Sequence, residues 1–234
     1  MSPPLKVHLA SASSRRAAWL ESYFEAHFEE GILEFSAAPL LTEEEPVESG
    51  ISVKAQVAQT LAAKVEAAKI EFTLASLAGR ETPEFILVAD TLVEDPDDSL
   101  ISLGKPSDRA SAGTMLLRLQ GRRHLVWSGS ALLQLADAAS ESSSEDEADS
   151  AIESRPAWRV ESMVEVATVE IDELSAAELA DLLDSDSWVG KAGAYDIAGA
   201  MGEHGRVVAG DEVCVLGLAP SVIARLDEVI DGKV

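Results

Sequence analysis

The residues Leu9-Ala10-Ser11-Ala12-Ser13-Ser14-Arg15-Arg16 join a short apolar run to the start of a helical pattern. The apolar run, residues 7–10, predicts a buried strand, and the periodicity over residues 14–28 predicts a helix. Three serines and two arginines therefore lie at a strand-to-helix turn. The first amides of a helix are unpaired donors at the positive end of its dipole, so this turn is suited to an anion.

Two interpretations of this turn stay open. Serine hydroxyls and forked arginine contacts can bind a phosphate group. Alternatively, the turn is an ordinary helix start, in which Ser13 or Ser14 is the N-cap and both arginines are solvated.

Strand and helix patterns alternate along the rest of the chain, which predicts an α/β fold. Strands are expected at residues 7–10, 32–37, 85–93, 100–103, 124–135, 159–171 and 207–208. Helices are expected at residues 14–28, 53–77, 109–119, 176–183 and 220–230. Ser175 is the expected N-cap of the fourth helix, with Glu178 at the capping-box position.

Composition and charge exclude several classes of function. The chain has 234 residues, of which 47% are hydrophobic, and a net charge of −24. Sequence-independent nucleic-acid binding and binding to an anionic membrane both need a basic surface, so neither partner is expected. No run approaches the roughly 18 apolar residues of a membrane span, and the start of the chain does not resemble a signal peptide. Cys214 is the single cysteine, so a reducing cytoplasm is the expected location.

The negative charge does not exclude an anionic ligand. Remote charges are screened within about 8–10 Å in physiological salt. A cation about 4 Å from the ligand contributes up to about 4 kcal/mol at an effective dielectric of 20. Local geometry therefore outweighs the global charge.

Residues 137–153 differ in composition from the rest of the chain. They include seven acidic residues and no basic one, and they lack periodic apolar positions. We interpret residues 137–157 as a solvated, disordered insertion between two strands of one domain over residues 1–234. A role in interaction or phosphorylation is the alternative.

Four further segments contain residues with useful chemistry. Asp90 interrupts an apolar strand run, where a buried carboxylate needs a partner. If Asp90 lies at the carboxyl end of its strand, it is where open α/β sheets place their ligand-binding and active sites. Lys105 lies between Gly104 and Pro106, and Lys191 lies in the small-residue stretch Gly190–Tyr195. The run Glu43-Glu44-Glu45 and Lys64 could serve a magnesium ion, because magnesium takes few protein carboxylates and shares the phosphates of its substrate. Ordinary turns, a strand-end cap and a solvated charge run are the alternatives.

Other common motifs are missing. The sequence contains no Walker A pattern, no Gly-x-Gly-x-x-Gly and no Cys/His zinc spacing. It also lacks the Gly-x-Ser-x-Gly of serine hydrolases.

In order along the chain, these segments resemble the Maf family of nucleoside triphosphate pyrophosphatases. Residues 9–16 resemble the family pattern L-A-S-x-S-P-R-R, with Ser14 in place of proline, and residues 89–91 and 104–106 resemble A-D-T and G-K-P. Residues 115–124 resemble M-L-x-x-L-x-G-x-x-H, residues 190–195 resemble G-K-A-G-x-Y, and residues 210–218 resemble G-D-x-x-x-V-x-G-L. Each motif is weak alone, but the ordered set is specific.

The resemblance implies a mixed central sheet flanked by helices, in two lobes with a cleft, as in Maf and inosine-triphosphatase proteins. It implies metal-dependent hydrolysis of a nucleoside triphosphate to the monophosphate and pyrophosphate, and it favours a homodimer. By this resemblance, Asp90 is the base that activates water. Asp90 and Glu45 would bind Mg²⁺ or Mn²⁺, with Glu44 as an alternative to Glu45.

The resemblance also assigns substrate contacts. The residues expected to hold the triphosphate are Ser11, Ser13, Arg15, Arg16, Lys64, Lys105 and Lys191. Arg15 and Thr91 match positions that influence nucleotide choice. The pyrimidine-preferring branch has glutamine where this chain has Ala198, so the base preference stays open. Val213-Cys214 replace the usual Ser-Asn of the late motif.

Two other functions remain alternatives. One is a nucleotide-binding regulatory module of cell division with little turnover. The other is a house-cleaning pyrophosphatase for non-canonical purine triphosphates such as ITP and XTP.

Overall fold

The computed structural model describes residues 3–42, 50–135 and 158–233. They contain a seven-stranded sheet with the order β2-β1-β3-β5-β6-β7, and β4 pairs with β3 outside this path. The β2–β1 and β1–β3 pairs are parallel and the others are antiparallel, so the expected mixed sheet is confirmed. The strands are β1 (Leu5–Ala10), β2 (Leu33–Ala38), β3 (Phe85–Asp95), β4 (Asp98–Leu103), β5 (Arg122–Leu135), β6 (Trp158–Ile171) and β7 (Gly205–Ala209).

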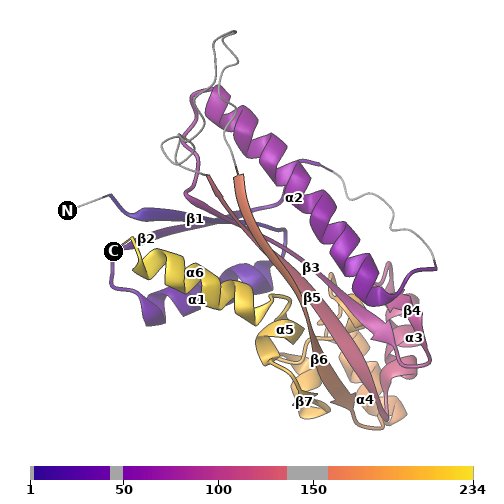
Figure 1. Ribbon diagram of the computed structural model, residues 1–234. Coiled ribbons are helices and arrows are strands. Elements are labelled where there is room, and N and C mark those ends of the chain that lie inside the picture. The colour runs from indigo at the N-terminus through magenta and orange to yellow at the C-terminus, as the bar shows by residue number, and fades with distance from the viewer. Residues whose placement is uncertain (1–2, 43–49, 136–157, 234) are drawn as a thin grey trace.

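Helices cover both faces of the sheet (Figure 1). The helix α2 lies along one face, and α1 and α6 lie on the other. The helices are α1 (Ser14–His27), α2 (Val53–Leu77), α3 (Arg109–Leu119), α4 (Ala176–Asp184), α5 (Glu212–Leu216) and α6 (Pro220–Asp231), with the 3-10 turns η1 (Ala192–Ala194) and η2 (Ala200–Glu203).

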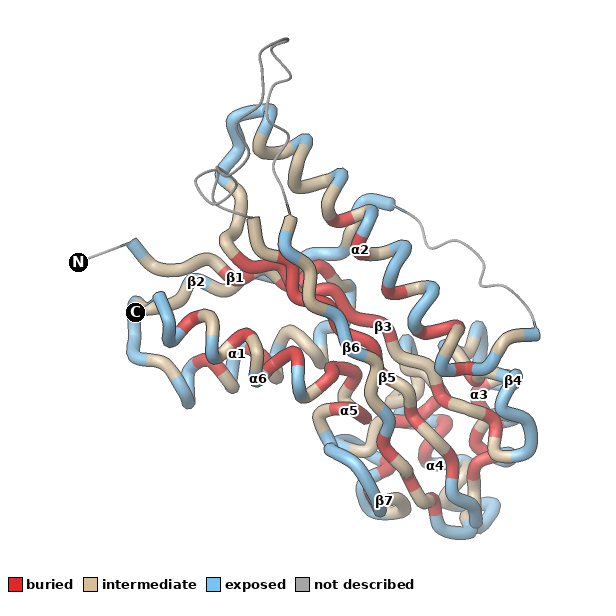
Figure 2. The backbone as a smooth tube through the Cα atoms, in the orientation of Figure 1, coloured by how far each residue is buried: buried red, intermediate tan, exposed pale blue. Residues whose placement is uncertain are grey.

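The long strands β3, β5 and β6 connect two lobes (Figure 1). The first lobe contains β1, β2, α1, α2 and α6, and the second contains β4, α3, α4, η1, η2 and β7. In the first lobe, neighbouring residues of β3 are buried on opposite faces of the sheet. Leu87 and Ala89 pack with α1 and α6, whereas Ile86 and Val88 pack with α2. The first six residues of β3 are all buried, and Figure 2 shows this part of the strand in red, as expected for a strand segment covered on both faces.

Local signals set the helix ends. Ser13 is the N-cap of α1, and its hydroxyl accepts from the backbone N–H of Arg16. Ser175 and Glu178 form the expected capping box of α4. The helices α2 and α3 have the expected bounds, because their apolar periodicity and capping residues agree.

Asp90 lies within β3, not at its carboxyl end. The strand β3 continues to Asp95, since its pairing with β5 extends through Val93. Along its other edge, β1 pairs with residues 85–88 and β4 pairs with residues 93–95. Among the strands of the described chain, residues 89–92 therefore have a neighbour on the β5 side alone. Asp90 lies in this gap, just beyond the carboxyl end of β1.

Two other elements differ from the expected pattern. The strand β7 has five residues where two were expected, and the five-residue helix α5 was not predicted. A helix this short shows no periodicity; the Asp211 cap and the burial of Cys214 and Val215 stabilise it. The expected insertion 137–157 and the residues Glu43-Glu44-Glu45 lie outside the described parts of the chain.

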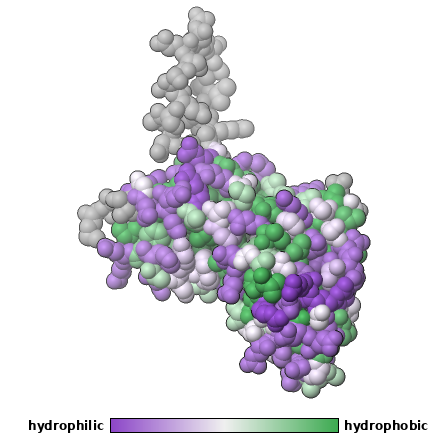
Figure 3. Space-filling model, turned by 60° about the horizontal axis from the view of Figure 1, so that its bottom comes forward, coloured by the Kyte–Doolittle hydropathy of each residue, from purple (hydrophilic) through white to green (hydrophobic). Residues whose placement is uncertain are grey.

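The surface in Figure 3 is mainly hydrophilic, with hydrophobic side chains gathered in separate patches. Among the described helices, none is both long and apolar enough to cross a membrane.

Candidate active site

Asp90 and Lys64 form an ion pair at the gap in the sheet. The Nζ atom of Lys64 lies 2.7 Å from Oδ1 of Asp90. Asp90 is 8% exposed, so its charge needs this partner. The position opposite Asp90 on β5 is Gly129, where a Cβ atom would lie 3.0 Å from the Val57 side chain of α2. The missing side chain lets α2 approach the sheet closely, and Lys64 reaches Asp90 from this helix.

Arg16 reaches the same gap from the first turn of α1. Its Nη1 atom donates to Ser11 Oγ at 3.1 Å and to the carbonyl of Ala89 at 3.4 Å. Its Nη2 atom donates to Thr91 Oγ1 at 2.8 Å. Arg16 therefore contacts Ser11 and also bonds Ala89 and Thr91, the two residues that flank Asp90 in the sequence. Ser13 caps α1 beside them, as the second interpretation of this turn expected. The solvated arginines of that interpretation are wrong, because Arg15 and Arg16 both form hydrogen bonds within the protein.

Gly217 lets Arg16 and Thr91 pack directly against the backbone. This glycine belongs to the motif at residues 210–218, but it was not among the predicted site residues. Its φ of +115° is a conformation that L side chains rarely adopt. A Cβ atom at this position would lie 2.7 Å from Arg16 Nε and 2.9 Å from Thr91 Oγ1. Glycine is therefore required both by its backbone angle and by the arginine packed against it.

The unusual residue Cys214 leaves the local polar contacts intact. Thr91 Oγ1 lies 2.9 Å from Ser128 Oγ, and Ser128 donates to the backbone carbonyl of Cys214 at 2.7 Å. Because the carbonyl accepts this bond, the identity of side chain 214 does not affect it. The thiol itself is buried, and burial raises its pKa to about 11.

Arg15 points to a different place than Arg16, although the two are adjacent in sequence. Its Nη1 atom donates to Asp196 Oδ1 at 3.1 Å, and its Nη2 atom donates to the Leu216 carbonyl at 3.0 Å. Lys191 Nζ lies 3.6 Å from the other oxygen of Asp196. Asp196 was not predicted as a site residue, although it follows the Gly190–Tyr195 motif directly.

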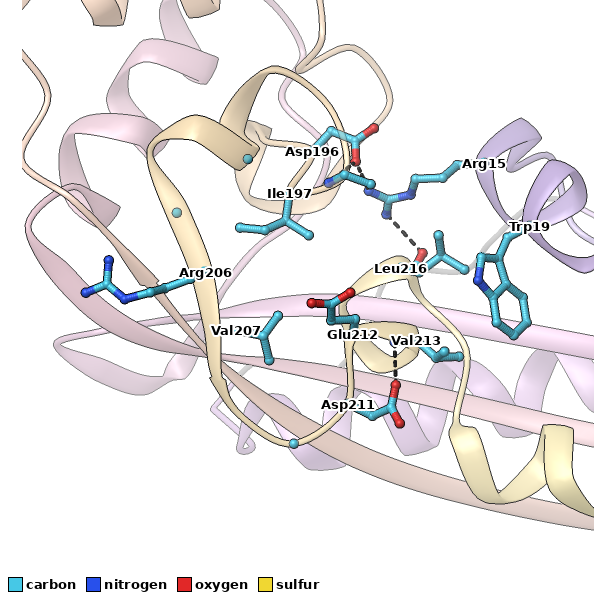
Figure 4. Close-up of a pocket in the computed structure, with 14 residues that line it drawn as sticks. Arg15, Trp19, Asp196, Ile197, Arg206, Val207, Asp211, Glu212, Val213 and Leu216 are labelled. Atoms are coloured by element: carbon cyan, nitrogen blue, oxygen red, sulfur yellow. Dashed lines mark hydrogen bonds and ion pairs between the residues drawn. The ribbon is translucent and has the colours of Figure 1, made fainter. Parts of the chain in front are cut away.

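A cavity of about 690 Å³ lies beside this cluster, and its walls come from both lobes (Figure 4). Arg15 and Trp19 of α1 form one side, and residues of η2, β7 and the α5 region form the other. Ala198 is also part of the lining. Arg206 of β7 points away from the cavity in Figure 4. Its guanidinium forms ion pairs with Glu170 and Asp172. The cavity is the cleft expected between the lobes.

Lys105 is exposed in the loop after β4. Its neighbour Gly104 accepts a hydrogen bond from Gly193 N at 3.1 Å, so the two lysine-containing loops are joined through their backbones. Within the described residues, Lys105 forms no hydrogen bond or ion pair with Asp90. Lys105 is therefore near the Lys191 loop, but the structure does not bring it to the carboxylate.

A buried hydrogen bond anchors the Lys191 loop to β5. His124 Nε2 and the hydroxyl of Tyr195 lie 2.8 Å apart, and their rings pack edge to face. Burial lowers the pKa of His124 to about 4 and raises the pKa of Tyr195. The histidine is therefore neutral near pH 7. These two motif residues have a structural role, because their bond fixes the backbone just before Asp196.

One carboxylate of the described site suits a divalent metal. Among the described residues, no group of three or more His, Cys, Asp or Glu side chains could hold a metal ion. Lys64 contacts Oδ1 of Asp90, and Oδ2 has no hydrogen-bond or ion-pair partner among the described residues. One hard carboxylate oxygen fits Mg²⁺, which commonly uses one or two carboxylates together with substrate phosphates. Glu44 and Glu45 lie outside the described residues, so the choice between them stays a prediction.

Comparison with known proteins gives a consistent match over nearly the whole chain. Residues 6–228 match the family described as Maf-like protein. A dTTP/UTP pyrophosphatase of Bordetella parapertussis is 32% identical over 92% of this chain and 87% of its own. One of Carboxydothermus hydrogenoformans is 29% identical over 95% of each.

A solved structure of a Mycobacterium abscessus nucleoside-triphosphatase, titled dITP/XTP pyrophosphatase, has a TM-score of 0.34 and 14% identity. It covers 74% of this chain and 75% of that one. The chain belongs to the Maf-like protein family.

Proposed function

We propose that this protein is a metal-dependent nucleoside triphosphate pyrophosphatase, which converts its substrate to a nucleoside monophosphate and pyrophosphate. The Lys64–Asp90 ion pair, in the gap that Arg16 borders, is the observation that carries this proposal. It combines a carboxylate with cations beside a cavity between two lobes. Membership of a family whose relatives are named dTTP/UTP pyrophosphatases supports the same activity.

In the proposed reaction, Asp90 accepts a proton from the attacking water. The water oxygen forms a new bond to phosphorus, the anhydride bond between the α- and β-phosphates breaks, and pyrophosphate leaves. Arg16 and Lys64 would offset the negative charge of the phosphates at the gap. Arg15, at the edge of the cavity, and the loop residues Lys105 and Lys191 would offset the rest of that charge. Ser11 and Ser13 supply hydroxyls at the start of α1.

Asp90, together with Glu45 as the family resemblance implies, would hold Mg²⁺ or Mn²⁺. A divalent cation there would neutralise phosphate oxygens. Asp90 has the hard oxygen that such an ion prefers.

We propose that the cavity beside Arg15 receives the base and sugar. Its volume of about 690 Å³ is within the range of small-molecule sites. The relatives' names suggest dTTP and UTP, but Ala198 in the lining has no side-chain amide to contact a base edge. Thymine and uracil are therefore the first bases to test, with ITP and XTP as competitors.

The test is pyrophosphate release from a panel of natural, modified and non-canonical nucleoside triphosphates with Mg²⁺ or Mn²⁺. Asp90→Asn keeps the size of the side chain and removes the base, so turnover should fall about 10²- to 10⁴-fold. The control is Asp97→Asn, because Asp97 forms an exposed ion pair with Arg122 outside the site.

Full activity of a folded Asp90→Asn variant would refute the role of Asp90. Saturable nucleotide binding without product over the whole panel would instead favour a regulatory module. Preference for ITP or XTP would indicate a house-cleaning enzyme for non-canonical purines.

Other expectations belong to the same proposal. We expect one domain, a cytoplasmic location, a homodimer, and no nucleic-acid or membrane partner. Sedimentation of the purified protein would test the homodimer.

A further inference from the structure

The carboxylate of Asp196 contacts Arg15, which is distant in sequence, and two residues of its own loop region, Lys191 and Ala198. Its Oδ1 atom accepts from Arg15 Nη1 at 3.1 Å and from the backbone N–H of Ala198 at 3.3 Å. Its Oδ2 atom lies 3.6 Å from Lys191 Nζ. The side chain of Asp196 is 17% exposed, and those of Arg15 and Lys191 are 24% and 23% exposed. This carboxylate therefore holds two of the cations assigned to the triphosphate, in a partly buried setting where ion pairs are less screened than at the surface.

The anchor itself is fixed from both sides. Tyr195, the preceding residue, is buried and bonded to His124 of β5. Ala198 N binds the carboxylate from the following turn. Asp196 therefore has little freedom to move away when a ligand enters. This argues against the alternative in which the carboxylate competes with a phosphate group for Arg15 and Lys191.

Arg15 retains binding capacity in this arrangement. A guanidinium has five N–H donors. One of those on Arg15 donates to Asp196 and one to the Leu216 carbonyl, and Arg15 lines the cavity (Figure 4). The remaining donors are presented by a side chain that is already ordered. Ordering it in advance removes an entropic cost that substrate binding would otherwise carry.

We propose that Asp196 is a positioning residue, which holds Arg15 and Lys191 for the triphosphate of the substrate. This inference rests on the proposed function. Asp196 does not touch the reacting atoms, so its loss should weaken substrate binding rather than the chemical step at Asp90.

The experiment compares Asp196→Ala, Asp196→Asn, Arg15→Ala and the double variant Arg15→Ala/Asp196→Ala. We measure KM and kcat with the triphosphate that the wild type hydrolyses fastest. Asp196→Ala should raise KM about tenfold and leave kcat nearly unchanged. Asp196→Asn keeps an acceptor for Arg15 but loses the ion pairs, so its KM should be intermediate. Asp97→Asn is the control and should leave both constants unchanged.

The double variant separates positioning from a general effect on the fold. If Asp196 acts through Arg15, adding Asp196→Ala to Arg15→Ala should raise KM by clearly less than it does in the wild type. Multiplicative effects would overturn the proposal. An unchanged or lower KM in both Asp196 variants would also overturn it, and the lower value would indicate a carboxylate that competes with phosphate.

A binding measurement keeps the two proposals distinguishable. Calorimetric titration with inorganic tripolyphosphate needs no turnover, and Asp196→Ala should weaken its affinity while Asp97→Asn should not. If the wild type binds tripolyphosphate but hydrolyses no triphosphate, the proposed function fails. The ratio of the tripolyphosphate affinities of the wild type and Asp196→Ala still tests whether Asp196 positions the cations. If the wild type binds neither ligand, both proposals are overturned. If Asp196→Ala does not fold, Asp196→Asn provides the comparison.

Discussion

Gly217→Ala is the substitution for which the structure gives the most specific expectation. The glycine has a φ of +115°, and its added methyl group would lie 2.7 Å from Arg16 Nε and 2.9 Å from Nη2. A strained backbone conformation of this kind costs about 1–3 kcal/mol for a non-glycine residue. Forcing an additional methyl group into a packed site costs about 1–3 kcal/mol more. We therefore expect Gly217→Ala to lower the free energy of unfolding by about 2–6 kcal/mol.

Gly31→Ala is a matched control for the backbone term. Gly31 has a φ of +86°, and a Cβ atom there would meet nothing within 4 Å. This variant should lose about 1–2 kcal/mol, because the left-handed conformation is its single cost. Urea unfolding of the two variants and the wild type measures both values.

The excess cost of Gly217→Ala should depend on Arg16. In an Arg16→Ala background the two closest atoms are removed, so the added methyl group should cost less than in the wild type. Pyrophosphate release should fall strongly in Gly217→Ala, since the displaced guanidinium would lose its bonds to Ala89 and Thr91. Equal stabilities and rates for the Gly217→Ala and Gly31→Ala variants would refute this reasoning.

Two further predictions concern pH and the acidic segment. Burial lowers the pKa of His124 from 6.5 to about 4. As the pH falls below 6.5, His124 binds a proton in the unfolded chain but not in the folded chain. The free energy of unfolding therefore decreases between pH 6.5 and 4. From pH 7 to 4 the wild type should lose about 3 kcal/mol more than His124→Gln in urea unfolding, and parallel losses would contradict this. Deletion of residues 137–153 should leave pyrophosphate release unchanged if they are a solvated insertion; a folded variant with reduced release would show that they contribute.

Local sequence patterns predicted most of the secondary structure. The bounds of α2 and α3 and the capping box of α4 agree with the structure, because each depends on residues within one or two helical turns. The same patterns missed α5, whose five residues are too few for a period. They also ended β3 two residues early, although Glu94 and Asp95 still pair with β4 in the hairpin that follows directly.

The ordered motifs likewise identified the family and most of the candidate site residues before any contact was known. They could not assign separate tasks to adjacent residues. Arg15 and Arg16 look equivalent in the sequence, yet one bonds Asp196 and the other bonds Thr91.

Hydrophobic periodicity and capping chemistry are short-range properties, so the amino-acid order alone was sufficient for the α/β class and for most helix ends. The placement of Asp90 in a gap between β1 and β4, the close approach of Gly217 to Arg16 and the anchoring of two cations by Asp196 emerged from the folded chain alone. The contacts of Gly217 with Arg16 and of Asp196 with Arg15 join segments that are far apart in sequence. Their geometry depends on how the strands are ordered and how closely the helices pack, which no local pattern encodes.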